Sequence, residues 1–69
     1  MSKYETIIYW SDADNIYIAE MPELKGCIAH GDSADEALKN IQKVSEEWLQ
    51  LAKEKNWIIP EPKGRLIFA

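Results

Sequence analysis

The segment from Pro22 to Ala37 restricts the fold of this chain more than any other part of the sequence. It reads PELKGCIAHGDSADEA and combines a proline, two glycines and a helix-capping pattern. Pro22 ends the extended segment before it, because proline has no amide hydrogen to give to a neighbouring strand. Gly26 and Gly31 mark points where the backbone bends or is approached closely. The segment therefore predicts a turn, a short strand and the beginning of a helix in quick succession.

A capping box predicts where the helix begins. Ser33 lies three residues before Glu36, so the serine hydroxyl can accept from one free backbone amide while the glutamate carboxylate reaches back to another. The apolar residues that follow recur at intervals of three and four, which predicts one amphipathic helix over residues 34–55. They are Ala37, Leu38, Ile41, Val44, Trp48, Leu49, Leu51 and Ala52. Asn56 is expected just beyond the end of this helix.

Four segments are typical of strands. Aromatic and β-branched residues fill 4–11 and 16–21, and the turn-forming residues between them predict an antiparallel hairpin with Asn15 in the left-handed conformation. Residues 27–30 predict a third strand, and residues 66–68 a fourth after a proline-containing connector. The expected fold class is α+β, in the order β-β-β-α-β. We expect a three- to four-stranded antiparallel sheet with one helix packed across one face.

The size of the chain limits how it can be stabilised. Its 69 residues form a single domain, residues 1–69, and a domain of this size buries only about 60% of the surface of the unfolded chain. Cys27 is the single cysteine, so no internal disulfide can form. Cys27 and His30 are too few ligands for a zinc site, and no metal or cofactor is expected. Self-association is the remaining route to extra stability.

The charge balance favours a protein partner over nucleic acid. Twelve acidic and eight basic residues give a net charge of -4, whereas direct nucleic-acid binding needs clustered cations. An ordinary soluble surface has a similar charge. The candidate acidic contacts are Asp12, Asp14, Glu46, Glu47 and Glu54. The sequence lacks an apolar run of the ~20 residues that a membrane span needs and lacks a signal-peptide pattern, so we expect a cytoplasmic protein without membrane contact.

The predicted hairpin has two apolar faces, and one helix can cover only one of them. A four-residue turn would pair Ser11 with Ile16. That register places four residues on the face expected to meet the helix, namely Ile8, Trp10, Tyr17 and Ala19. A slip of one residue would exchange the two faces.

The second face of the hairpin is the candidate interaction surface. Its residues are Ile7, Tyr9, Ile16 and Ile18. Exposed apolar patches of this kind usually mark interaction sites, although an edge loop or the C-terminal tail could instead fold over it. Trp57 is a further candidate contact, either at an oligomer interface or under the proline connector.

The residue pattern predicts no enzyme. Cys27 and His30 are three positions apart in a strand and point to opposite faces, so the histidine cannot activate the thiol. The carboxylates that could suggest a two-metal nuclease are Asp12, Asp14, Glu20 and Asp32. Such a site needs carboxylates that converge on metals about 4 Å apart, whereas the first two of these belong to the predicted turn and the last to the beginning of the helix.

The sequence resembles the HicB-like antitoxin family. The resemblance extends from Tyr4 to the end of the chain, and four motifs carry it: Glu20-Met21-Pro22-Glu23-Leu24, Gly26-Cys27, Gly31-Asp32-Ser33 and Glu36-Ala37-Leu38-Lys39-Asn40-Ile41. It implies a partial ribonuclease H-like fold and homo-oligomers. It also implies an antitoxin that blocks HicA, a small basic toxin that cleaves messenger RNA.

The resemblance and the residue pattern lead to the same expected function. An acidic chain with an apolar patch suits a basic toxin surface, because charge speeds encounter and apolar contact supplies affinity. Many members of the family carry a C-terminal DNA-binding domain of helix-turn-helix or ribbon-helix-helix type. The sequence ends at Ala69, so no such domain is expected here. The alternative function is that of a homo-oligomeric structural or regulatory protein without a toxin partner.

Overall fold

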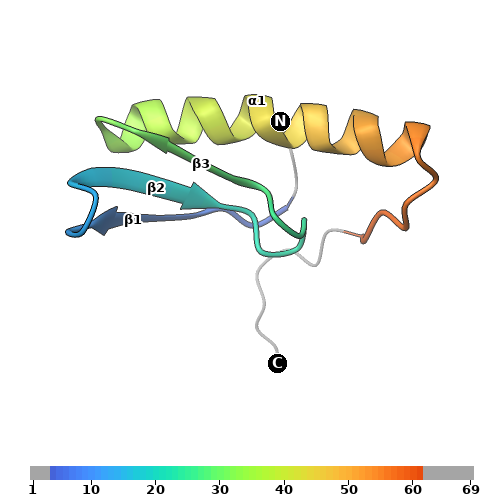
Figure 1. The fold of residues 1–69 in the computed structure, drawn as a ribbon, viewed down its shortest axis with the longest axis horizontal. Helices are drawn as coiled ribbons and strands as arrows, with labels where there is room; N and C mark the ends of the chain where they lie inside the picture. The colour runs from blue at the N-terminus through green and yellow to red at the C-terminus, as the bar shows by residue number, and fades with distance from the viewer. Residues whose placement is uncertain (1–3, 62–69) are drawn as a thin grey trace.

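A computed structural model of the chain describes residues 4–61, which form a three-stranded sheet followed by one long helix (Figure 1). The elements are β1 (Ile7–Ser11), β2 (Ile16–Glu20), β3 (Ile28–Gly31) and α1 (Ala34–Glu54). Neighbouring strands are antiparallel, in the spatial order β1-β2-β3. The expected α+β class and the helix packed across one face of the sheet are confirmed. The predicted strand at residues 66–68 lies outside the described residues.

The boundaries of the elements differ slightly from those expected. The strands predicted at 4–11, 16–21 and 27–30 become shorter or shift by one residue, and the helix ends at Glu54 rather than at residue 55. A compact loop between β2 and β3 explains why β2 ends earlier and β3 begins later than predicted. The Met21 amide donates to the Cys27 carbonyl (3.1 Å), and the Cys27 amide donates to the Leu24 carbonyl (2.9 Å). Gly26, with φ of 81°, occupies the left-handed position of that second turn, so Cys27 belongs to the loop.

The register of the hairpin agrees with the prediction. Ser11 pairs with Ile16 across a turn in which Asn15 is left-handed, with φ of 57°. Since side chains alternate along a strand, the helix side of the sheet carries Ile8 and Trp10 from β1, Tyr17 and Ala19 from β2, and Ala29 and Gly31 from β3. The two alanines are buried, and Ile8 and Tyr17 pack against the core.

One stripe of α1 supplies the other half of the core. Its buried residues are Ala37, Ile41, Ser45 and Ala52, with Leu38, Val44, Trp48 and Leu49 half-buried beside them. Ser45 was not predicted on this stripe, and its hydroxyl donates to the Gln42 carbonyl (2.8 Å), which satisfies the polar group. Leu51 was predicted on the stripe but is 40% exposed, because one residue step turns it by about 100° from the buried Ala52.

The predicted capping residues at both ends of the helix are confirmed. The Ser33 hydroxyl accepts from the Glu36 amide (3.1 Å). The Glu36 carboxylate reaches one residue further back than expected and accepts from the Asp32 amide. At the other end, left-handed Asn56 donates to the Lys53 carbonyl (3.3 Å), and the next amide donates to the Ala52 carbonyl (2.9 Å). This pair of bonds is a Schellman motif.

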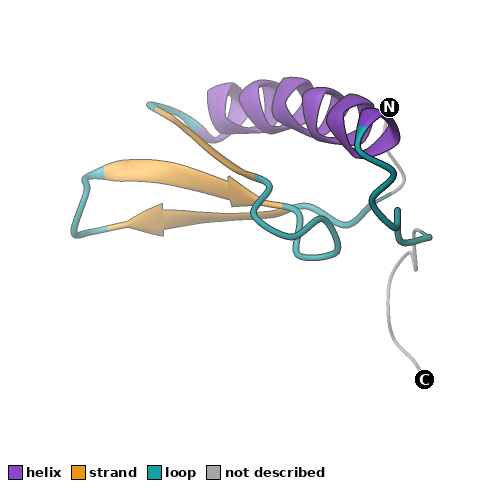
Figure 2. Ribbon diagram, turned by 45° about the vertical axis from the view of Figure 1, so that its right-hand side comes forward, coloured by secondary structure: helices purple, strands orange, loops and turns teal. Residues whose placement is uncertain are grey.

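The helix does not lie centrally on the sheet. It packs most closely on β3, less on β2 and least on β1, which is the strand farthest from it (Figures 1 and 2). The small side chains of Ala19 and Ala29 and the bare backbone of Gly31 allow this close approach. Trp10 was expected to meet the helix but is 45% exposed. It packs edge-on against Tyr17 instead, with ring centroids 5.0 Å apart.

Candidate interaction surface

The face of the sheet opposite α1 has no helix of the described chain over it, and we call it the open face (Figure 2). By strand alternation its residues are Ile7, Tyr9, Ser11, Ile16, Ile18, Glu20, Ile28 and His30. Ile7, Tyr9 and Ile28 are 47%, 41% and 53% exposed, and Ile16 and Ile18 are half-buried. The structure therefore brings together four of the predicted contact residues, Ile7, Tyr9, Ile16 and Ile18.

Sequence reasoning missed Ile28 on this face. The signal was present, because Ile28 alternates with Cys27 and Ala29, which are both buried. A strand with small buried residues on either side of an isoleucine must point that isoleucine to the opposite face. Ile28 therefore adds an exposed apolar side chain on the third strand, and Glu20 lies between it and Ile7 in the register.

A hydrogen bond across two strands orders the middle of the open face. The Tyr9 hydroxyl donates to a Glu20 carboxylate oxygen at 2.5 Å. This bond to the carboxylate, together with partial desolvation and the negative charge of Glu20, raises the pKa of Tyr9 above its ordinary value. The bond links the Tyr9 side chain on β1 to Glu20 on β2 across the open face.

Acidic side chains gather at one end of the sheet, in the turn between β1 and β2 and around the beginning of α1. The turn between β1 and β2 and the first turn of α1 lie at the same end of the molecule (Figure 1). We call this group the acidic end, and its residues are Asp12, Asp14, Asp32, Asp35 and Glu36. Neither residues 11–16 nor residues 31–38 contain lysine or arginine. A basic partner that reached the open face from this end would meet uncompensated negative charge.

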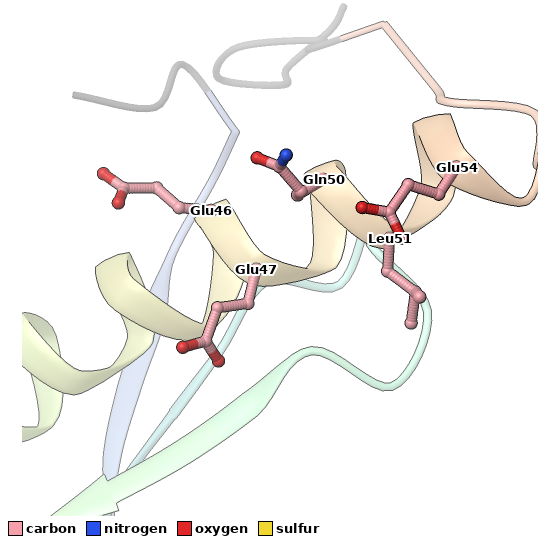
Figure 3. A pocket seen from close by; sticks show the side chains of 5 residues that line it. All are labelled: Glu46, Glu47, Gln50, Leu51 and Glu54. Atoms are coloured by element: carbon pink, nitrogen blue, oxygen red, sulfur yellow. The ribbon is translucent and has the colours of Figure 1, made fainter.

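The predicted acidic contacts on the helix are separated from the open face. Glu46, Glu47 and Glu54 line a hollow of about 410 Å³ on α1 together with Gln50 and Leu51 (Figure 3). The side chains of Glu46 and Glu47 fan out in different directions rather than converge (Figure 3). Within residues 4–61, no three histidine, cysteine or carboxylate side chains cluster as metal ligands. These helix residues and the acidic end cannot serve a single compact contact.

Trp57 also lies away from the open face. Its ring packs against that of Trp48 on α1, with centroids 5.9 Å apart. The two rings line an apolar groove of about 460 Å³ with Glu23, Lys25, Ile58 and Pro60. The Trp48 indole nitrogen donates to the Lys25 carbonyl (2.9 Å) and fixes the loop before β3 to the helix. Trp57 thus lies just beyond the end of α1 and shares this groove with Pro60 of the proline connector, while its role at an oligomer interface stays a prediction.

The thiol of Cys27 is placed as a packing group. Cys27 is 3% exposed, whereas His30 is exposed on the opposite face, as their spacing predicted. Burial raises the pKa of the Cys27 thiol above its ordinary value, which disfavours the thiolate that a nucleophile requires.

The carboxylates of Asp12 and Asp14 have local partners in the turn. Asp12 accepts from the Trp10 indole (2.8 Å), and Asp14 accepts from the Ser11 hydroxyl (3.4 Å).

Comparison with known proteins identifies the family. The family model described as UPF0150-like matches residues 3–60. The chain belongs to this family. Related UPF0150 proteins occur in a cyanobacterium and an archaeon, and none of their names states an activity. The match therefore covers nearly all the described fold of this UPF0150-like chain.

Three relatives illustrate the extent of the similarity. A UPF0150 protein of Synechocystis sp. is 41% identical over 51 residues, which cover 72% of this chain and 74% of the relative. A second Synechocystis protein is 33% identical over 60 residues, covering 87% and 82% of the two chains. A UPF0150 protein of Thermoplasma acidophilum is 34% identical over 62 residues, or 90% of each chain. No solved structure matches this UPF0150-like chain.

The helix of the described chain is amphipathic rather than uniformly apolar. Within residues 4–61, no helical segment combines the length and apolar character that crossing a bilayer requires.

Proposed function

We propose that this chain is an antitoxin-type binding module that neutralises a small basic, messenger-RNA-cleaving toxin of the HicA kind by covering its RNA-binding surface. The observation that carries the proposal is the open face, on which Ile7, Tyr9 and Ile28 are each at least 41% exposed, while the one helix among residues 4–61 covers the other side. Several large apolar side chains exposed on one face of a sheet are typical of a protein interface. The sequence resemblance to HicB-like antitoxins supports the same class of function.

The charges around the open face suit a partner that binds RNA. A toxin that holds RNA displays cations to the phosphates, and the acidic end offers carboxylates to such cations without an intervening lysine or arginine. Electrostatic attraction would orient the toxin during encounter, and the apolar patch would then supply the affinity. In this arrangement the carboxylates at the acidic end take the place of RNA phosphates on the toxin.

The proposed role is binding without catalysis by this chain. The raised pKa of the buried Cys27 thiol works against nucleophilic attack, and the carboxylates of the acidic end lie in a turn and a helix start rather than around one pocket. Neutralisation by steric cover needs neither a cofactor nor a metal ion. It requires only that the toxin and RNA compete for the same toxin surface.

Titration with a small basic messenger-RNA-cleaving toxin of the HicA kind tests the proposal. The test variant is Ile28→Asp, which puts a charge into the open face, and the matched control is Ile58→Asp, which changes an isoleucine that is 92% exposed elsewhere. We expect Ile28→Asp to weaken the complex by about tenfold or more and to restore RNA cleavage by the toxin. The control should bind like the unmodified chain. Absence of a complex, or equal binding by both variants, would contradict the proposal.

The alternative is a homo-oligomeric structural or regulatory protein without a toxin partner. Among residues 4–61, the outer edge of β1 has no neighbouring strand, and such an edge suits pairing with a second copy of the chain. Self-association without any complex with the neighbouring gene product would support this alternative. Self-association together with toxin binding would show that the outer edge of β1 and the open face can both be occupied in the same assembly.

A further inference from the structure

Glu20 is the one carboxylate that the three strands of the described chain place on the open face. In the register it lies between Ile7 on β1 and Ile28 on β3, and Ile18 precedes it on the same face of β2. The strands contribute no lysine or arginine to this face, and its histidine, His30, is opposite Ile18. A charge placed among isoleucines is costly to cover unless the partner brings an opposite charge to it.

The bond from Tyr9 prepares the Glu20 carboxylate for a further donor. Tyr9 donates to one of the two carboxylate oxygens, whereas an ionised carboxylate has about four lone-pair sites in all. The remaining sites can therefore accept from a partner. Because Glu20 is half-buried and already held by Tyr9, it loses little side-chain freedom when a partner binds.

A small hollow of about 80 Å³ opens beside Glu20, where the loop after β2 meets β3. Its other lining residues are Met21, Pro22, Leu24, Gly26, Cys27 and Ile28, so Glu20 supplies its only charged side chain. Sites for small molecules usually measure about 300–1,000 Å³, which excludes a cofactor or metabolite. A water molecule needs only about 10–15 Å³, so the hollow is of a size for the end of one side chain.

We propose that Glu20 receives one arginine side chain of the toxin, whose guanidinium group enters this hollow and pairs with the carboxylate that Tyr9 holds. The inference rests on the proposed function and deepens it, because it names the group through which the open face recognises its partner. Ile7 and Ile28 would exclude water from the pair, as apolar residues do around the strongest contacts of an interface. A pair shielded from water attracts more strongly than the same charges on an exposed surface.

The surroundings of Glu20 suit arginine better than lysine. A guanidinium group is less strongly hydrated than an ammonium group, so it loses less on entering an apolar hollow. Its parallel N–H groups match the two oxygens of a carboxylate, and its plane can stack on an aromatic ring such as that of Tyr9. Arginine also binds phosphate, so the toxin could not use the same side chain for RNA and for Glu20 at once.

Binding of a small basic messenger-RNA-cleaving toxin of the HicA kind tests the pair. Glu20→Gln removes the charge but keeps the shape of the side chain and an acceptor for Tyr9. We expect the dissociation constant of the toxin to rise about tenfold or more, mainly through faster dissociation, because a covered charge pair acts after encounter. Glu54→Gln makes the same charge change on α1 and should bind like the unmodified chain. Circular dichroism establishes that both variants are folded.

Nuclear magnetic resonance of ¹⁵N-labelled toxin identifies the group that Glu20 receives. In the saturated complex with the unmodified chain, one arginine Nε–H signal should shift and exchange more slowly with solvent. In the saturated complex with Glu20→Gln, the same signal should lose this shift and protection. A lysine ammonium signal that responded in place of the arginine signal would overturn the assignment.

The chain's own arginine is the rival occupant of the hollow. Arg65 is the single arginine of the sequence and lies outside the described residues. Arg65→Gln should leave the ¹³C signal of the Glu20 carboxylate unchanged in the free chain, and a shift of that signal would overturn the inference. A complex that Glu20→Gln leaves as tight as before would contradict this inference alone. Absence of any complex with the unmodified chain would contradict the proposed function and, with it, the inference.

Discussion

The backbone of Gly31 lies directly against the backbone of Ala37 at the beginning of α1. A Cβ atom at position 31 would lie 2.5 Å from the Ala37 amide nitrogen and 2.8 Å from the Glu36 carbonyl carbon. Both neighbours belong to the helix backbone and cannot move independently of it. The absence of a side chain on β3 therefore sets how closely α1 approaches the sheet.

Gly31→Ala should destabilise the domain through this contact. The added methyl group has to push α1 away from β3, and overpacking of this kind typically costs about 1–3 kcal/mol. We expect urea unfolding to show that loss in the free energy of unfolding. Gly26→Ala is the control, because Gly26 has no neighbour within 4 Å of the added Cβ atom but a φ of 81°. It should cost about 1–2 kcal/mol from left-handed strain alone. An unchanged stability for Gly31→Ala would mean that α1 lies farther from the sheet.

Ser33→Ala should weaken the beginning of the helix. The substitution removes the acceptor of the Glu36 amide bond, and loss of such a cap costs about 1 kcal/mol. Ser33→Asp keeps an acceptor at the same position and should retain most of the stability. Thermal unfolding followed by circular dichroism compares the three proteins. Equal melting temperatures for the alanine and aspartate variants would contradict a capping role.

Trp48→Phe should loosen the loop before β3. Phenylalanine keeps a ring on α1 but cannot donate to the Lys25 carbonyl, which the Trp48 indole reaches at 2.9 Å. We expect a loss of about 1 kcal/mol and faster amide hydrogen exchange in residues 21–27. Trp57→Phe retains the ring contact with Trp48 and is the matched control. Unchanged exchange in Trp48→Phe, or equally fast exchange in both variants, would contradict a role for the hydrogen bond in holding the loop.

The Cys27 thiol should make stability fall at alkaline pH. Its pKa is raised in the folded state by burial, so the unfolded chain loses this proton at lower pH than the folded chain. The resulting stabilisation is fully present below the unfolded pKa of about 9 and is lost as pH rises through the folded pKa. The difference in unfolding free energy between the unmodified chain and Cys27→Ala should therefore shrink above about pH 9. The pKa of Tyr9 is also raised, but both proteins contain Tyr9, so its effect on stability cancels when their unfolding free energies are subtracted. A pH-independent difference would contradict a buried thiol.

Local signals in the sequence predicted most of the fold. Ser33, Asn15 and Asn56 each favour one backbone conformation, and the structure places all three as expected. The register followed from the length of the turn after Ser11. These features depend on only a few neighbouring residues, which is why a single sequence is sufficient to find them.

The lateral position of α1 could not be predicted in the same way. It depends on the combined small size of Ala19, Ala29 and Gly31 on two different strands, which only the tertiary structure brings together. Because the helix follows these residues, Trp10 stays exposed although its strand position was predicted correctly. Trp57 likewise depends on the path of the chain after the helix. Four of the five predicted contact residues share the open face, and their role in binding stays a prediction.

Nuclear magnetic resonance mapping tests the central claim most directly. The chain, labelled with ¹⁵N and ¹³C-methyl groups, is titrated with a small basic toxin of the HicA kind. We predict that the perturbed signals belong to open-face residues, above all Ile7, Tyr9 and Ile28, and to the acidic end, while Leu51 and Ile58 stay unchanged. Perturbations confined to the outer surface of α1 around Glu46 and Glu54, with the open face silent, would contradict the account.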